Sequence, residues 1–218
     1  MSSRTGKRRN RSATGCQEPG ESHNYATLEA IVRAYKLRFR PRSQEELEAF
    51  ASESTLLAAV KRAGWAERPD GKRYDHQRRI PRDALEVSAN RLRRAKLETA
   101  RTFDDLYDIV SRAIGSIRGI GELTVYDTAL RIGAKLSLAP DRIYLHAGTR
   151  VGARKLGLNW REDSLALSDI PEALRELKPR EIEDCLCIFE EHFTNIRNRP
   201  SNTRLQPSTA GTIVSRRG

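Results

Sequence analysis

The chain has 218 residues, of which 40 are Lys or Arg and 29 are Asp or Glu, giving a formal net charge of +11. Such a charge attracts polyanions, of which nucleic acid is the commonest inside cells, although basic segments can also be merely solvated. Three cysteines cannot form a complete disulfide framework, and no apolar run reaches the roughly 18 residues of a membrane helix. We therefore expect a cytoplasmic protein with no membrane contact.

Metal sites and cofactors are not indicated by the sequence. Cys185 and Cys187 are spaced like half of a metal site, but no Cys or His pair completes it with a usable spacing. The cysteines are typical of small buried apolar side chains in a reducing compartment.

Both ends of the chain predict disordered basic tails. Residues 1–22 consist largely of Ser, Gly, Arg and Lys, and residues 197–218 are rich in Pro, Ser and Thr with little periodicity. Such segments cannot bury enough apolar surface to order themselves. A basic tail can tether a protein to DNA or can simply be solvated, and the sequence leaves both open. The segment between them, 23–196, predicts one helical domain.

Apolar residues in the first half of this domain recur at the three- and four-residue spacing of helix faces. This spacing predicts a helix over 25–39. Ser43 and Glu46, three residues apart, predict a capping box that opens one helix over 43–65. Residues 66–80 are polar and contain Pro-Asp-Gly, so they predict a loop.

The second half continues the helical pattern. Pro81 is suited to the first turn of the next helix, and Thr102 predicts the N-cap of the one after it. Further helices are expected in three segments: 144–158, 168–177 and 178–193. The expected fold is all-α, a compact cluster of about seven or eight helices.

A Gly-Ile-Gly turn lies between two of these helices, within residues 102–138. It fits the helix-hairpin-helix pattern at Ile114, Ile117, Gly119, Ile120, Gly121, Thr124 and Val125, with only Val125 replacing the usual Ala. Glycines let a backbone turn sharply and approach a ligand, and the first amides of the following helix are free to bind a phosphate oxygen. Arg118 adds positive charge at the rim. The alternative is that the turn is only a corner between packed helices.

Other basic residues are candidate contacts to the phosphate backbone. The candidates are Arg150 and Arg154 at helical spacing after the hairpin, and Arg73, Arg78 and Arg79 in the polar loop. Tyr74 within that loop could stack on a base, or the whole loop could be solvated. Glu122 and Asp127 near the turn would repel phosphate unless a cation covers them. These features predict DNA, with backbone contacts to a duplex, as the partner.

The hairpin, followed by a helix, a break and a helix ending in ARKLGL, resembles the helix-hairpin-helix DNA glycosylase superfamily over about residues 102–158. The resemblance implies an all-α base-excision repair protein that clamps DNA with this hairpin and flips a damaged base into a pocket. It does not extend to the iron–sulfur loop of some members, because that loop needs four cysteines.

The sequence departs from this family at the two positions that carry its chemistry. Bifunctional members have a lysine at the position of Leu123, where no amine is available for Schiff-base attack. The family's aspartate would fall near His146, in a stretch without a carboxylate. Asp141, 18 residues beyond Leu123, or His146 could replace it, but both residue types are also common in purely structural roles.

Three functions are therefore compatible with the sequence. The first is a DNA-binding protein that lacks the family's usual catalytic residues. The second is an active DNA glycosylase in which Asp141 or His146 is the substituted catalytic residue. The third is a protein-interaction module in which the hairpin is only a corner.

Overall fold

The computed structural model describes residues 25–197. The two predicted tails lie outside this range, except for Arg197, which ends the last helix. Within the described range the chain is mostly helical and confirms the all-α fold class. Its α-helices are α1 (Leu28–Arg38), α2 (Arg40–Ala51), α3 (Leu56–Gly64), α4 (Arg82–Leu92), α5 (Phe103–Ile114), α6 (Glu122–Leu136), α7 (Ala147–Leu156), α8 (Pro179–Ile188) and α9 (Glu190–Arg197).

Short elements connect these helices. The strands β1 (Ile143–Tyr144) and β2 (Ser164–Leu165) pair antiparallel, with Ile143 opposite Leu165. The 3₁₀ helices are η1 (Asp75–Gln77), η2 (Leu97–Thr99), η3 (Leu167–Asp169) and η4 (Glu172–Glu176).

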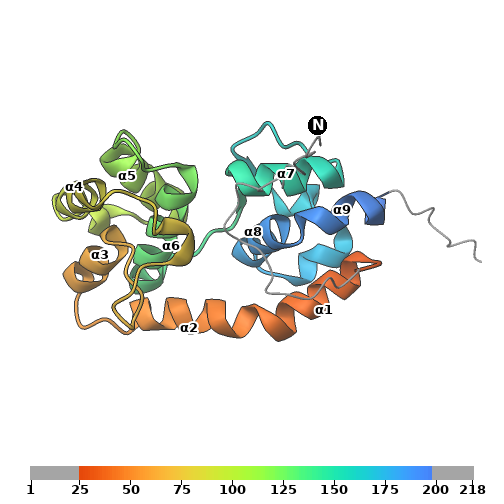
Figure 1. Ribbon diagram of the computed structural model, residues 1–218, viewed down its shortest axis with the longest axis horizontal. Coiled ribbons are helices and arrows are strands. Elements are labelled where there is room, and N and C mark those ends of the chain that lie inside the picture. Colours follow the sequence, from red (N-terminus) through yellow and green to blue (C-terminus); the bar gives the residue numbers. More distant parts are fainter. Residues whose placement is uncertain (1–24, 198–218) are drawn as a thin grey trace, which may run out of the picture.

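The helices form two groups, which α2 joins along one side of the molecule (Figure 1). The first group, here called the hairpin half, contains α3 to α6, and its core includes Leu106, Ile114 and Ile132. The second group, the C-terminal half, contains α1, the small sheet and α7 to α9, around Ile31 and Leu186. The chain thus enters the C-terminal half with α1, crosses through α2, and returns after α6.

Polar contacts tie the first two helices to α8. The Tyr35 hydroxyl of α1 donates to Asp184 Oδ2 of α8 at 2.6 Å, and Arg40 of α2 donates to both carboxylate oxygens of Glu181 at 2.9 Å. Because both donors precede residue 41 and both acceptors follow residue 180, these bonds close a long loop of chain.

The N-terminus of α5 is as the sequence predicts. The Thr102 side chain accepts from the Asp105 amide at 3.1 Å, and the Asp105 carboxylate accepts from the Thr102 amide at 3.0 Å. This reciprocal capping satisfies two amide groups that the helix itself leaves unpaired.

The predicted helix over 43–65 is wrong in its bounds. α2 already begins at Arg40, so Ser43 and Glu46 lie inside the helix and form no capping box there. The segment divides after Ala51, because Thr55 caps a separate helix by accepting from the Ala58 amide at 3.1 Å. Polar residues between them favour this local cap over a continuous helix.

The expected helix over 168–177 is also corrected. The chain forms η3 and η4 there, and Pro171 stands between them as the N-cap of η4. Proline disfavours the α conformation at the residue before it and has no amide to donate, so the segment breaks into two short turns.

Helices α7 and α8 pack in close contact because of a glycine. A Cβ built on Gly152 would lie 2.0 Å from the Leu186 carbonyl oxygen. Position 152 therefore has no room for a side chain. The α7 helix is thereby fixed against α8, which carries part of the site described next.

Candidate nucleic-acid interface and the adjoining pocket

The turn between α5 and α6 leads into a helix whose first amides have no side-chain cap among residues 25–197. Gly121 is the N-cap residue, and within the described residues no side chain caps this helix. Gly121 and Glu122 are exposed, and a Cβ built on Gly121 would meet no atom within 4 Å. Gly119 has φ +93°, which favours glycine, and its added Cβ would lie 3.2 Å from Pro81 Cδ. The backbone is therefore both sharply turned and accessible.

The residues around the turn play different parts. Ile120 is only 8% exposed and packs into the core of the hairpin half, so it fixes the turn against that core. Arg118 is exposed at the rim. A hydrogen bond from the Thr124 hydroxyl back into the turn is absent from the described structure; the Thr124 carbonyl accepts from Thr128 Oγ1 instead, at 2.7 Å.

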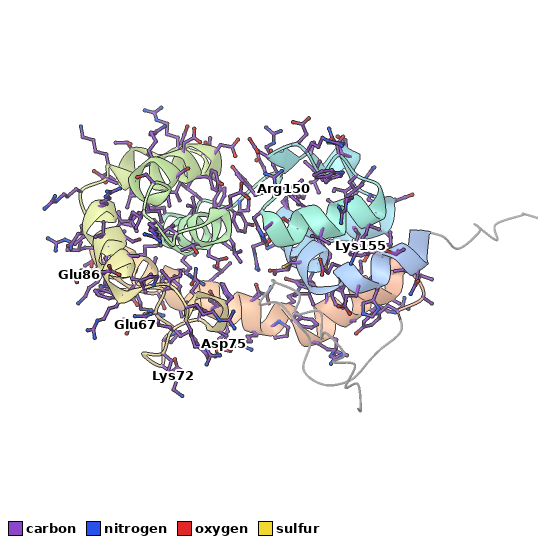
Figure 2. The ribbon with its side chains drawn as sticks, turned by 45° about the horizontal axis from the view of Figure 1, so that its top comes forward. Glu67, Lys72, Asp75, Glu86, Arg150 and Lys155 are labelled. Atoms are coloured by element: carbon purple, nitrogen blue, oxygen red, sulfur yellow. The ribbon has the colours of Figure 1, made fainter. Side chains whose placement is uncertain are left out.

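Arg150 lies where the two halves face each other (Figure 2). Its guanidinium donates to the carbonyl oxygens of Trp160 at 3.2 Å and Glu162 at 2.6 Å, and it lies 3.8 Å from the Glu122 carboxylate. Arg150 therefore fixes the loop that follows α7, and it partly neutralises Glu122, the acidic residue beside the turn between α5 and α6. Arg154, one helical turn later, is exposed, with its guanidinium 6.0 Å from the centre of the Trp160 ring.

Contacts of its own side chains order part of the polar loop over residues 66–80. Arg73 donates to the Ile80 carbonyl at 3.0 Å, Arg78 lies 3.4 Å from Asp75, and Arg79 is exposed. Tyr74 is 7% exposed, and the Arg131 guanidinium covers its ring at 3.6 Å. The suggestion that Tyr74 stacks on a base is therefore corrected, because its ring already has a cation against it.

A pocket of about 130 Å³ lies at the junction of the two halves, and we call it the junction pocket. Residues of α2, α6 and α8 line it, together with His76 of η1. Leu123 is among them, as the second residue of the helix that starts at the hairpin. Helix α6 thus runs directly from the exposed turn to this pocket. Asp127, Arg131 and Glu183 bring charge to its walls.

Asp127 is held by two hydrogen bonds and one ion pair. His76 Nε2 lies 2.7 Å and Gln77 Nε2 3.1 Å from its Oδ2, and Arg131 Nη2 lies 3.8 Å away. Burial by itself would raise the pKa of the Asp127 carboxyl, but the His76 hydrogen bond and the Arg131 charge outweigh it, so the pKa falls below its ordinary value. Arg131 also donates to Glu46 of α2 at 3.0 Å, which joins α6 to α2.

Glu183 of α8 lines the same pocket from the C-terminal half, and its pKa moves in the opposite direction to that of Asp127. Burial raises the pKa of its carboxyl, although the hydrogen bond and charge of His146 oppose that effect. His146 Nε2 lies 2.5 Å from Glu183 Oε1, and His146 itself is the N-cap residue of α7. His146 therefore contacts Glu183 but does not itself line the junction pocket. Asp141 is exposed in the turn before β1.

The residues of the junction pocket have no strong joint signal in the sequence. Asp127 is recognisable there only as a charge that would repel phosphate, and Glu183 has no distinguishing pattern. No short motif links them, because the two positions are 56 apart in the sequence. Their shared signal is that each carboxylate falls on the buried face of its helix, which a sequence alone shows only weakly.

Residues 25–197 contain no helix that combines the length and the apolar character needed to cross a bilayer. The same residues contain no cluster of His, Cys, Asp or Glu side chains arranged to hold a metal ion. Comparison with protein-family models, curated proteins and solved structures finds no match to this chain.

Proposed function

We propose that this protein binds DNA by holding backbone phosphates at the turn between α5 and α6. The observation that carries this proposal is the N-terminus of α6, where no side chain in the described residues caps the helix and the Gly121 position is open. Unpaired amides and the positive end of the helix dipole form a ready site for a phosphate oxygen. Contacts of this kind recognise the backbone rather than the base sequence.

The charges around the turn support the proposal. Glu122 and Asp127 would repel a phosphate, but Arg150 faces the first, and His76 and Arg131 cover the second. Arg118 remains exposed beside the turn. The net charge of +11 favours a polyanionic partner for the chain as a whole. The resemblance to the helix-hairpin-helix glycosylases favours DNA as that partner.

The experiment uses two nearly isosteric substitutions at the open glycine. In Gly121→Asp, the new carboxylate should accept a hydrogen bond from the backbone amide of Leu123 or Thr124. It then occupies an amide that would bind phosphate, and it adds a negative charge that repels phosphate. In Gly121→Asn, the side chain caps in the same way without the charge. Aspartate and asparagine are both preferred N-caps, and Gly121 already has the extended backbone of an N-cap, so both variants should fold at least as stably as the wild type.

Affinity for a duplex is measured by fluorescence anisotropy at several salt concentrations. We expect salt-sensitive binding by the wild type, a loss of about tenfold or more in Gly121→Asp, and a smaller loss in Gly121→Asn. Wild-type affinity that does not change with salt, or a well-folded Gly121→Asp variant that binds as tightly as the wild type, would reject the proposal.

A second candidate function is cleavage of the N-glycosidic bond of a nucleotide in the bound DNA. The observation that favours it is the pair of carboxylates in the junction pocket, whose environments move their pKa values in opposite directions. A protonated Glu183 can donate a proton to the departing base, and an ionised Asp127 can stabilise the positive charge that develops on the sugar. Water then adds to the anomeric carbon and loses a proton, which restores Glu183 and leaves an abasic site. In this arrangement His146 acts through Glu183 as a positioning residue, and Asp141 has no part.

The test for this function is the release of bases from duplexes carrying assorted modified bases, read as abasic sites. Glu183→Gln should abolish release, and Asp141→Asn should leave it unchanged. His146→Ala should shift the pH profile of release. Activity that survives Glu183→Gln but not Asp141→Asn would return the catalytic role to Asp141.

A further inference from the structure

An open groove of about 420 Å³ lies on the hairpin half, between the end of α4 and the face of α5. Its floor is apolar, formed by Ile109 and Ala113 of α5 with Ala95, and its rim consists of three arginines, Arg91, Arg94 and Arg112. All three arginines are exposed. This surface is separate from the junction pocket and shares no lining residue with it.

The rim carries positive charge that the described protein does not neutralise. In residues 25–197 no carboxylate oxygen lies within 4 Å of a nitrogen of Arg91, Arg94 or Arg112, whereas Arg78, Arg131 and Arg150 all have such partners. Arg93 and Lys96 add two further exposed cations in the same short segment. Arginine is suited to phosphate because its planar fork donates two parallel hydrogen bonds.

The groove adjoins the hairpin. Arg91 Nη1 donates to Ser116 Oγ at 3.0 Å and to the Ala113 carbonyl at 3.4 Å, so it is anchored to the segment that leads from α5 into the turn. The groove and the turn therefore lie on the same half of the molecule and are joined by one short segment. A phosphodiester backbone, which alternates charged phosphates with apolar sugar faces, fits cationic rims around an apolar floor.

We infer that the α4–α5 groove is a second contact site for the nucleic-acid backbone, where Arg94 and Arg112 bind phosphates next to those held by the hairpin. This inference rests on the proposed function, since it extends the same DNA along the hairpin half. Arg91 serves mainly to fix the groove to the hairpin segment. The contact is independent of sequence and lengthens the site that the protein covers.

The experiment compares two double variants with the same change in charge. Arg94→Glu with Arg112→Glu alters the groove, and Arg33→Glu with Lys178→Glu alters exposed cations of the C-terminal half. We expect the groove variant to bind duplex about tenfold more weakly at 0.1 M salt, with a salt slope shallower by about two, because each lost phosphate contact removes about 0.9 from it. The control should lose less than about threefold, and Arg94→Lys with Arg112→Lys should retain most of the affinity.

Each outcome separates this inference from the proposed function. If Gly121→Asp loses binding while the groove variant binds as the wild type does, the groove is not a contact site and the hairpin proposal stands. Equal losses in the groove variant and the control would show an effect of net charge alone and overturn the inference. A groove variant that keeps its affinity but unfolds at lower temperature would also overturn it, because the cations would then only complement the C-terminal end of α4.

Discussion

The imidazole of His146 and the carboxyl of Glu183 form a hydrogen bond of 2.5 Å between α7 and α8, with both side chains almost fully buried. The same glutamate lines the pocket that α6 reaches from the hairpin half. A buried carboxyl is costly when ionised unless it is paired, so this contact couples the packing of the C-terminal half to a proton.

Glu183→Gln is expected to change how stability depends on pH. Because burial raises the pKa of Glu183 above its ordinary 4.5, the folded wild type holds this proton more tightly than the unfolded chain does. The stability of the wild type therefore falls as pH rises from 4.5 through the pKa of the folded state. The variant lacks this loss. Urea unfolding at pH 4.5 and 6 should therefore show the variant gaining on the wild type as pH rises. Glu86→Gln, at an exposed position of α4 (Figure 2), is the control, and a relative loss by Glu183→Gln would contradict the prediction.

Asp127→Asn should have the opposite pH signature. Although burial opposes it, the His76 hydrogen bond and Arg131 keep the pKa of Asp127 below its ordinary 3.8, so its stabilising contribution is present above that value and is lost as pH falls through the folded pKa. We expect a loss of about 2 kcal/mol in the free energy of unfolding at pH 7, which shrinks toward pH 3. Asp108→Asn, on the exposed face of α5, should cost little. A loss that is constant with pH would show that packing rather than charge is responsible.

Signals between residues that are close in sequence predicted many of the helices. The apolar periodicity of α5 and the Thr102 cap were readable because both depend on residues within one or two turns of each other. The same holds for Ile120, whose burial follows from the spacing of the hairpin pattern. The prediction for 43–65 failed for a related reason: Ser43 has the right spacing to Glu46, but the helix starts earlier, at Arg40.

The candidate pocket was not predictable in the same way. Its chemistry depends on Asp127 meeting His76 and on Glu183 meeting His146, which are contacts across 51 and 37 residues. Such contacts are fixed by how two helical groups dock, and no repeating spacing encodes them. The position of Leu123 was the closest signal, because it follows the hairpin directly and faces the pocket.

Tyr126→Phe is expected to stabilise the protein. Tyr126 is 2% exposed, and its hydroxyl has no hydrogen-bond partner among the described residues. A buried hydroxyl without a partner costs free energy, so its removal should raise the free energy of unfolding by about 1 kcal/mol. Thermal and urea unfolding test this. Tyr35→Phe is the matched control and should destabilise, because its hydroxyl donates to Asp184 at 2.6 Å. Equal losses in both variants would show that the Tyr126 hydroxyl does have a partner.

Gly152→Ala should destabilise the C-terminal half even though alanine favours a helix interior by about 1 kcal/mol over glycine. The added Cβ would lie 2.0 Å from the Leu186 carbonyl oxygen, a backbone atom that cannot rotate away, so α7 and α8 must separate. Overpacking of this kind costs about 1–3 kcal/mol, and we expect the upper end in urea unfolding at pH 7. Arg154→Ala, exposed in the same helix, should change the free energy of unfolding by less than about 0.5 kcal/mol. If Gly152→Ala instead raised stability, helix propensity would outweigh packing, and the close contact between α7 and α8 would have to be looser than described.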